Sequence, residues 1–270
     1  MKLFPIALAL LMMLLTGTVI AQTDTLPDDA DARVNIDLDA DEDDDNDDSW
    51  TIKFGKKRKS KKRVKTRFLM LDWGISTLAN NGSLDLPLGY EAFDQQYWGS
   101  NNWKFHVIRQ RVTFADEHVN LMYGLTFDWQ NYEFTSDQRL DHQSPVVNLI
   151  DEGIDYTFNE LSTSFITIPL MLNFETNPEN KWRSFRLNAG VYGSLLLDAE
   201  LDLKSSVDGE QEFDDSTFNL NKARWGVIGE IGYGALNFYV DYSLTDLFIE
   251  EENSGFVLQP INIGVKIIPF

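Results

Sequence analysis

The sequence feature that most constrains the fold is a long alternation of apolar and polar residues from Phe185 to Leu203. The odd-numbered positions, including those at 199, 201 and 203, carry apolar or small side chains, and most even-numbered positions carry polar ones. Successive side chains of a β-strand point to opposite faces, so this pattern predicts a strand with one apolar face, whereas a helix would mix the two sets. The run exceeds the roughly five or six residues usual in a strand and is long enough for the roughly 9–11 residues that cross a bilayer.

Seven further segments show a similar alternation, and together they predict an all-β fold. The predicted strands cover residues 66–78, 103–114, 119–134, 161–174, 185–203, 222–233, 236–244 and 256–270. The connections between them are alternately long and short. This arrangement is typical of an eight-stranded antiparallel up-and-down transmembrane β-barrel, which has long loops on one side of the membrane and short turns on the other.

Some predicted strands contain irregular features. In the first strand, the alternation predicts that Phe68 shares the polar face of Asp72. In the second strand, the apolar residues change parity midway, which predicts a β-bulge. Proline lacks the N–H that a strand ladder uses, so two further bulges are expected, at Pro169 and Pro260.

The polar faces of the predicted strands carry charges of both signs. They are Asp72, Arg109, Arg111, Asp128, Arg186, Arg224, Glu230, Asp241 and Lys266. The interior of an eight-stranded barrel has just enough room for side chains, so these residues predict a lumen filled by ion pairs rather than an open pore.

The apolar faces are expected to contact lipid. The residues assigned to lipid are Leu187, Val191, Leu195, Val227, Ile231, Phe238 and Val240, and those assigned to the lumen include Arg186, Arg224, Glu230 and Asp241. The alternative is a soluble barrel of the lipocalin type, in which the apolar face would point inward and the charged face would meet water.

The chain divides into three parts by composition. Residues 1–21 have the basic start, apolar core and small-residue exit of a secretory signal peptide, with cleavage predicted before Gln22; the alternative is a membrane helix. Residues 22–64 form a charged tail that is predicted to be disordered, and residues 65–270 form the predicted barrel. The chain has no cysteine, which excludes a lipoprotein anchor, disulfides and thiolate metal sites.

The net charge of −20 argues against general nucleic-acid binding. The acidic run from Asp24 to Asp48 lacks the central glycine of an EF-hand loop, so loose counterion binding is expected there instead of a calcium site. The basic run from Lys53 to Arg67 could pair with the acidic run or lie against anionic lipid headgroups.

The sequence predicts no catalytic, cofactor-binding or metal site, and therefore no enzyme. The three histidines, His106, His118 and His142, have no partners at metal-ligand spacing. The stretch from Asp141 to Ser144 contains the residue types of a catalytic triad, but neighbouring positions in a sequence do not by themselves make a triad.

The chain resembles the PorT-like outer-membrane β-barrel family of Bacteroidetes type, from about Arg67 to Phe270. The resemblance rests on the signal peptide, the segment from Phe165 to Leu172 with its internal proline, the segment from Gly190 to Leu195, and the terminal Phe270. Two features depart from the family: the alternate apolar residues of the last strand have the opposite parity to Phe270, and the charged tail is additional. The resemblance implies a location in the cell outer membrane and no particular reaction.

Three functional classes follow. The first is a non-catalytic envelope component that acts through its extracellular loops or its periplasmic tail. The second, implied by the resemblance, is an accessory of protein secretion or envelope assembly. The third is an enzyme with its site at the barrel rim. The expected partners are outer-membrane lipid and a periplasmic or secretion-system protein, with no nucleic acid; the sequence does not indicate an oligomeric state.

Overall fold

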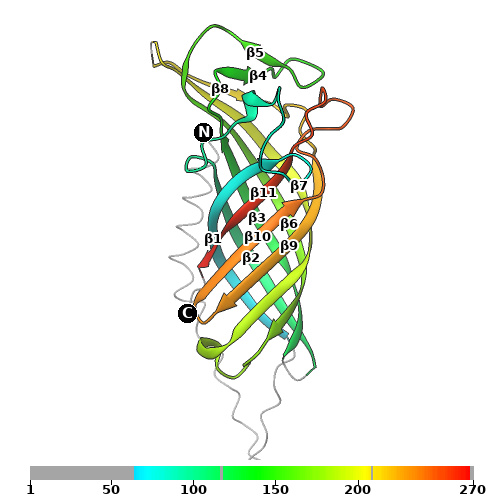
Figure 1. Ribbon diagram of the computed structural model, residues 1–270. Helices are drawn as coiled ribbons and strands as arrows, with labels where there is room; N and C mark the ends of the chain where they lie inside the picture. Colours follow the sequence, from blue (N-terminus) through cyan, green and yellow to red (C-terminus); the bar gives the residue numbers. More distant parts are fainter. Residues whose placement is uncertain (1–63, 116–117, 208, 268–270) are drawn as a thin grey trace, which may run out of the picture. The chain divides into compact units, whose positions relative to one another are not determined.

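The computed structural model describes residues 64–115, 118–207 and 209–267, and within these ranges the chain forms a closed β-barrel (Figure 1). The predicted signal peptide, the charged tail up to residue 63 and Phe270 lie outside the described residues. None of the helices in the described ranges is long and apolar enough to cross a membrane.

Eight antiparallel strands make the ring, as predicted. They are β1 (Val64–Ala79), β2 (Asn101–Ala115), β3 (Val119–Glu133), β6 (Tyr156–Glu175), β7 (Phe185–Ser205), β9 (Ala223–Tyr233), β10 (Leu236–Ser243) and β11 (Gln259–Ile267). Each strand pairs with the next one along the chain, and the β1–β11 ladder closes the ring.

The connections contain short elements that the sequence did not predict. They are the 3-10 turns η1 (Glu91–Phe93) and η2 (Lys181–Arg183) and the strands β4 (Gln138–Leu140), β5 (Leu149–Asp151) and β8 (Gln211–Asp215). The sequence predicted loops in these places. β8 was missed because it is mostly acidic and does not alternate; it is a strand because it pairs with the projecting end of β7.

The connections divide the barrel into two ends (Figure 1). The short β2–β3, β6–β7 and β9–β10 connections lie together at what we call the turn end, where β1 begins and β11 ends. The four long connections, with β4, β5 and β8, lie at the loop end.

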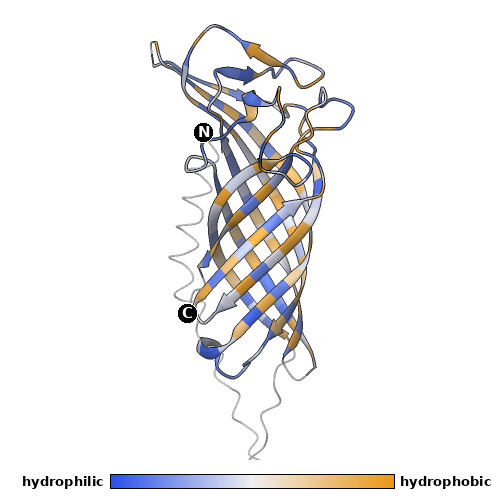
Figure 2. Cartoon of the chain, in the orientation of Figure 1, coloured by the Kyte–Doolittle hydropathy of each residue, from blue (hydrophilic) through white to orange (hydrophobic). Residues whose placement is uncertain are grey.

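The outer surface of the barrel is apolar and its interior is polar, as predicted for a membrane barrel. The residues assigned to lipid are all exposed: Leu187, Val191, Leu195, Val227, Ile231, Phe238 and Val240. Arg224, Glu230 and Asp241 are buried in the lumen, and Arg186 is half-buried. Figure 2 shows apolar and polar residues alternating along the strands. The soluble lipocalin-type alternative is therefore wrong, because that barrel would bury the apolar face.

The expected bulge in the second strand is present, and β1 contains a matching irregularity. The register of β2 shifts between His106 and Ile108. In β1, Leu69 has a left-handed backbone with φ of 55°, which reverses the alternation of the preceding residues. Phe68 is consequently 62% exposed on the outside, so the prediction that it shares the face of Asp72 was wrong.

A second irregularity, in β7, contradicts part of the prediction for that strand. The β6–β7 register shifts where Phe165 pairs with Leu196 and Ser164 with Asp198, which leaves Leu197 as an extra residue. Beyond this bulge the odd-numbered residues Ala199, Leu201 and Leu203 are buried inside the barrel. The prediction that the alternation continues without interruption through Leu203 was therefore wrong for this end of the strand.

The two prolines do not cause the expected bulges. Pro169 pairs with Tyr192 without a register shift, and on its other side the β3–β6 ladder has no Cα partners between Leu170 and Thr167. Pro260 follows the first residue of β11 and pairs only with Leu78. Each proline thus sits where one neighbouring ladder is unpaired, so its missing N–H removes no bond there.

The main apolar core lies at the loop end. Its members come from strand ends and from loops: Leu78, Phe93, Tyr132, Phe134, Leu140, Val147, Leu161, Ala199, Leu201, Leu203, Phe218, Leu220, Leu247, Phe248 and Leu258. Phe93 is central, because its ring lies 5.8 Å from that of Phe134 and 5.7 Å from that of Phe248. We call this set the loop-end core; its packed side chains cover the polar lumen on that side.

Candidate functional site

The middle of the lumen is filled by buried ion pairs between strands far apart in the sequence. The Lys104 ammonium lies 2.5 Å from an Asp241 oxygen and 3.5 Å from an Asp128 oxygen. Arg224 pairs with Asp128 at 3.1 Å and lies over the Phe165 ring. An unpaired charge buried in the lumen would cost a large amount of free energy. These side chains therefore neutralise one another, and they also fill the space.

A second group of charges lies nearer the turn end. Glu230 accepts from Arg109 at 2.9 Å and from Lys266 at 2.6 Å. Asp72 lies 3.4 Å from Lys266 and 2.7 Å from His106 Nε2. His106 also contacts the Thr126 hydroxyl at 2.8 Å through Nδ1, so both of its ring nitrogens are used within the lumen network.

The structure thus brings the predicted lumen charges together and adds others that sequence reasoning missed, among them the buried Lys104 and Glu175. Lys104 lies on the irregular second strand, where the change in alternation prevented its inward direction from being predicted. Glu175 is the last residue of β6, just beyond the predicted end of that strand. A continued reading of the even-apolar, odd-polar pattern of β6 would have placed Glu175 inside.

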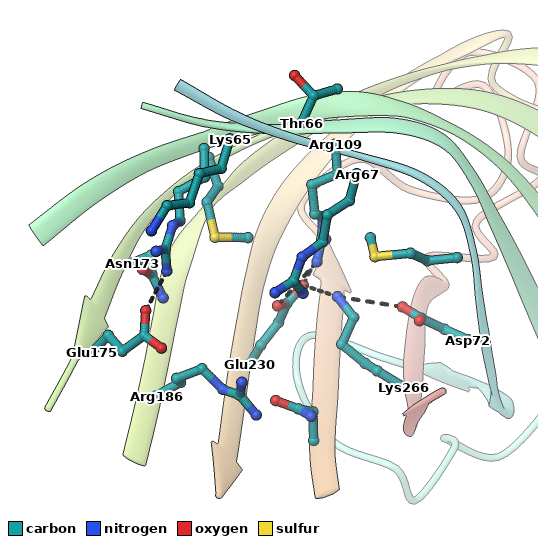
Figure 3. A pocket seen from close by; sticks show the side chains of 14 residues that line it. Lys65, Thr66, Arg67, Asp72, Arg109, Asn173, Glu175, Arg186, Glu230 and Lys266 are labelled. Carbon is teal, nitrogen blue, oxygen red and sulfur yellow. Dashed lines mark hydrogen bonds and ion pairs between the residues drawn. The ribbon is translucent and has the colours of Figure 1, made fainter. Parts of the chain in front are cut away.

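A cavity of about 220 Å³ lies at the turn end of the lumen (Figure 3). We call it the turn-end cavity; it is lined by Lys65, Thr66, Arg67, Met70, Asp72, Arg109, Arg111, Met122, Asn173, Glu175, Arg186, Glu230, Asn237 and Lys266. Six of these side chains are cationic and three are carboxylates, a formal excess of three positive charges. The cavity is therefore strongly positive in a protein whose total charge is −20.

The irregularity at Leu69 and the bulge in β2 produce this concentration of positive charge. The alternation of inward and outward residues shifts by one position in β1 and in β2 at the same height in the barrel. As a result Arg67 lines the cavity directly opposite Arg109, and Lys65 lines it directly opposite Arg111. Like charges directly opposite each other on one sheet face are destabilising. The arrangement is therefore one that packing alone would not favour.

The carboxylates lining the cavity leave part of this charge unmatched. Arg111 pairs with Glu175, and Glu230 is shared by Arg109 and Lys266. Among the described residues, Arg67 makes no hydrogen bond or ion pair, and Arg186 donates only to the carbonyl of Gly234. Three arginines that line the cavity also have a buried N–H group with no hydrogen-bond acceptor in the described part of the chain: Arg109 Nε, Arg111 Nη2 and Arg186 Nε.

The loop end holds a separate charged cluster. Arg139 on β4 lies 3.3 Å from Asp214 on β8 and 3.1 Å from Glu152, and His142 Nδ1 lies 3.2 Å from Asp214. The Ser144 hydroxyl accepts from the Val146 N–H at 3.3 Å. These contacts tie the β4–β5 hairpin to β8 and do not link Ser144 to His142 as a nucleophile and base would be linked.

The remaining histidine, His118, makes a backbone contact, and the described residues contain no group of metal ligands. His118 Nδ1 lies 2.7 Å from the carbonyl of Glu175 at the turn end. In residues 64–115, 118–207 and 209–267, no three His, Asp or Glu side chains are grouped so that they could hold a metal ion.

An acidic row crosses the outer surface towards the loop end. Glu160 pairs in register with Glu133 on one side and with Asp202 on the other, beyond the run of outward apolar residues from Ile166 to Phe174. Burial, assisted by its two acidic neighbours, raises the pKa of Glu160 to about 7 against the hydrogen bond that Ser162 donates. Burial also raises the pKa values of Glu133 and Asp202.

Comparison with known proteins gives a family match. A family model described as "Outer membrane protein beta-barrel domain" matches residues 94–249, which is more than half of the chain. The matched region runs from the first long loop to the last one. No curated protein is significantly similar in sequence.

Proposed function

Because the chain belongs to the outer membrane protein β-barrel domain family, and its barrel therefore lies in the outer membrane, we propose that it is a non-catalytic, non-conducting envelope component that binds a partner at one of its ends. In such barrels the short turns face the periplasm and the long loops face the outside. The turn end is accordingly assigned to the periplasm and the loop end to the cell exterior.

The observation that carries this proposal is the state of the lumen. Its middle is filled by buried ion pairs around Lys104, Asp128 and Asp241, and its outer end is covered by the loop-end core. A barrel of this kind offers no continuous aqueous route, so its useful surfaces are its loops and its periplasmic end.

The test is conductance in a planar bilayer. The purified full-length protein is expected to give no stepwise ion currents, while a 16-stranded porin in the same bilayer gives them. Stable channel openings at neutral pH would contradict the non-conducting role.

A second candidate is an accessory of protein secretion or envelope assembly, as the resemblance to PorT-like barrels suggests. The feature that supports it is the turn-end cavity, whose lining has six cationic side chains and lies at the end assigned to the periplasm. A photo-crosslinking residue at Trp182, in the β6–β7 turn, is expected to capture a periplasmic protein in cells, whereas the same residue at the exposed loop position Leu88 is not. Capture from Leu88 alone would favour an extracellular partner instead.

The proposal that the protein is not an enzyme is tested at the rim. The purified protein should show esterase and phospholipase activities only at background, and His142→Ala and Ser144→Ala should not change them. An activity that either substitution abolishes would support the rim enzyme.

A further inference from the structure

We propose that the turn-end cavity binds a phosphate group, either free phosphate or a phosphate ester, that enters from the periplasmic side. The inference rests on the proposed function in one respect, because it treats the cavity as a closed-ended cup rather than as part of a pore. It goes beyond that function by naming the ligand chemistry and the residues that recognise it.

The first argument is charge. The lining has three more cationic than acidic side chains, and β1 and β2 hold two like-charged pairs directly opposite each other. An anion between these strands would relieve the repulsion. A phosphate monoester carries about −1.5 to −2 charges at pH 7, so it matches the excess better than a single carboxylate does.

The second argument is the supply of donors. Figure 3 shows Arg67 and Arg186 entering the cavity from two sides, with Glu230 between them. Arg67 makes no hydrogen bond or ion pair with the described residues, and Arg111 and Arg186 each retain a buried N–H without an acceptor there. The planar guanidinium fork is suited to the bidentate recognition of phosphate oxygens, so three arginines from β1, β2 and β7 can surround one group.

The third argument is size and access. Drug-sized ligands usually occupy pockets of roughly 300–1,000 Å³. The turn-end cavity, at about 220 Å³, is smaller and suits a compact anionic group. Lys65, Arg67 and Arg186 are only half-buried, so the ligand can reach them from the turn end.

The test is isothermal titration of the full-length protein in a non-ionic detergent at constant ionic strength. Three probes are used: inorganic phosphate, glycerol 3-phosphate as a soluble phosphate monoester, and acetate as the carboxylate. We expect saturable binding of at least one phosphate probe and weaker binding of acetate. Tighter binding of glycerol 3-phosphate would identify a phosphate monoester as the ligand, and tighter binding of inorganic phosphate would identify the free ion.

Arg67→Gln removes a guanidinium that makes no ion pair with the described residues, so the barrel should still fold. A charge-assisted hydrogen bond contributes enough that its loss should weaken phosphate binding about tenfold or more. Arg183→Gln is the matched control, because Arg183 is an exposed arginine of η2 at the same end and does not line the cavity. Should Arg67→Gln not fold, Arg186→Gln takes its place.

Three results would overturn the inference: no saturable phosphate binding, equal affinity for acetate, or equal weakening by Arg67→Gln and Arg183→Gln. None of these depends on conductance, which is measured separately in the planar bilayer. A protein that conducts but loses phosphate binding with Arg67→Gln would contradict the non-conducting role and leave the phosphate site standing.

Discussion

At the residue scale, the direction of a single side chain depends on its position relative to a bulge. Val191 lies before the irregularity of β7 and faces outward with 47% of its surface exposed, whereas Leu201 lies beyond it and is fully buried. The two residues have the same parity in the sequence.

Val191→Arg should impair insertion or lower the stability of the barrel. An arginine on the lipid face near the bilayer midplane costs about 2–4 kcal/mol. Denaturant unfolding in liposomes measures the loss. Val207→Arg is the matched control, because Val207 lies in a loop-end turn and is 84% exposed, so its substitution should be nearly neutral. Equal effects of the two substitutions would argue against lipid contact at Val191.

Leu201→Ala should destabilise the barrel by about 2–5 kcal/mol, because it opens a cavity in the loop-end core. The exposed Leu195 provides the control: its replacement by alanine removes surface that faces lipid and leaves no internal cavity. The free energies of unfolding of the two variants decide. If Leu195→Ala were the more damaging change, the bulge at Leu197 would be misplaced.

Lys104→Met should be strongly destabilising, by about 3–5 kcal/mol, since it leaves the buried carboxylates of Asp128 and Asp241 without their shared cation. Lys204→Met, at an exposed position near the end of β7, serves as the control. Urea unfolding monitored by tryptophan fluorescence gives both values. A neutral Lys104→Met would mean that the lumen network does not hold the barrel together.

At the element scale, the strands pass from a lipid-facing part to a part that projects beyond the apolar belt. On β7 this change coincides with the bulge at Leu197: the outward residues before it are apolar, and those after it include Glu200 and Asp202. The same bulge turns Leu201 and Leu203 inward into the loop-end core. One extra residue thus exchanges both faces of the strand where its surroundings change.

The acidic row across β3, β6 and β7 should make stability depend on pH. The pKa of Glu160 is raised in the folded barrel to about 7, so the folded state binds a proton that the unfolded chain releases at a lower pH. The stabilising contribution is fully present below about pH 4.5, the ordinary pKa of a glutamate, and is lost as the pH rises through 7.

The corresponding measurement is thermal unfolding between pH 5 and pH 8. Wild-type stability should fall over this range, and Glu160→Gln should reduce the fall. Glu251→Gln, at an exposed loop position, should leave the pH profile unchanged. An identical profile for Glu160→Gln and the wild type would exclude Glu160 as the titrating group.

At the scale of the whole molecule, the barrel is closed by its own described strands, since β1 pairs with β11 over nine Cα positions from Leu71 to Ala79. Removal of residues 22–62 is therefore expected to leave folding into detergent or lipid unchanged, as judged by heat-modifiable migration on gels. Failure of the truncated chain to insert would assign the segment a structural role.

The sequence by itself determined the class of fold, because the two-residue period of a strand is a local property that can be read from any stretch with one apolar face. Eight such stretches, joined by alternately long and short connections, were sufficient to predict the ring, and the parity of Leu187, Val191 and Val227 gave their outward direction correctly. The mixed charges on the opposite parity were likewise enough to predict a filled lumen.

Only the tertiary structure decided where the alternation changes phase and which charges meet. A bulge is a property of two paired strands, so the inward turn of Arg67 and Leu201 depends on the registers of β1 with β2 and of β6 with β7. The ion pair between Lys104 and Asp241 joins residues 137 positions apart. The turn-end cavity arises in the same way, because its arginines come from strands that only ring closure brings together.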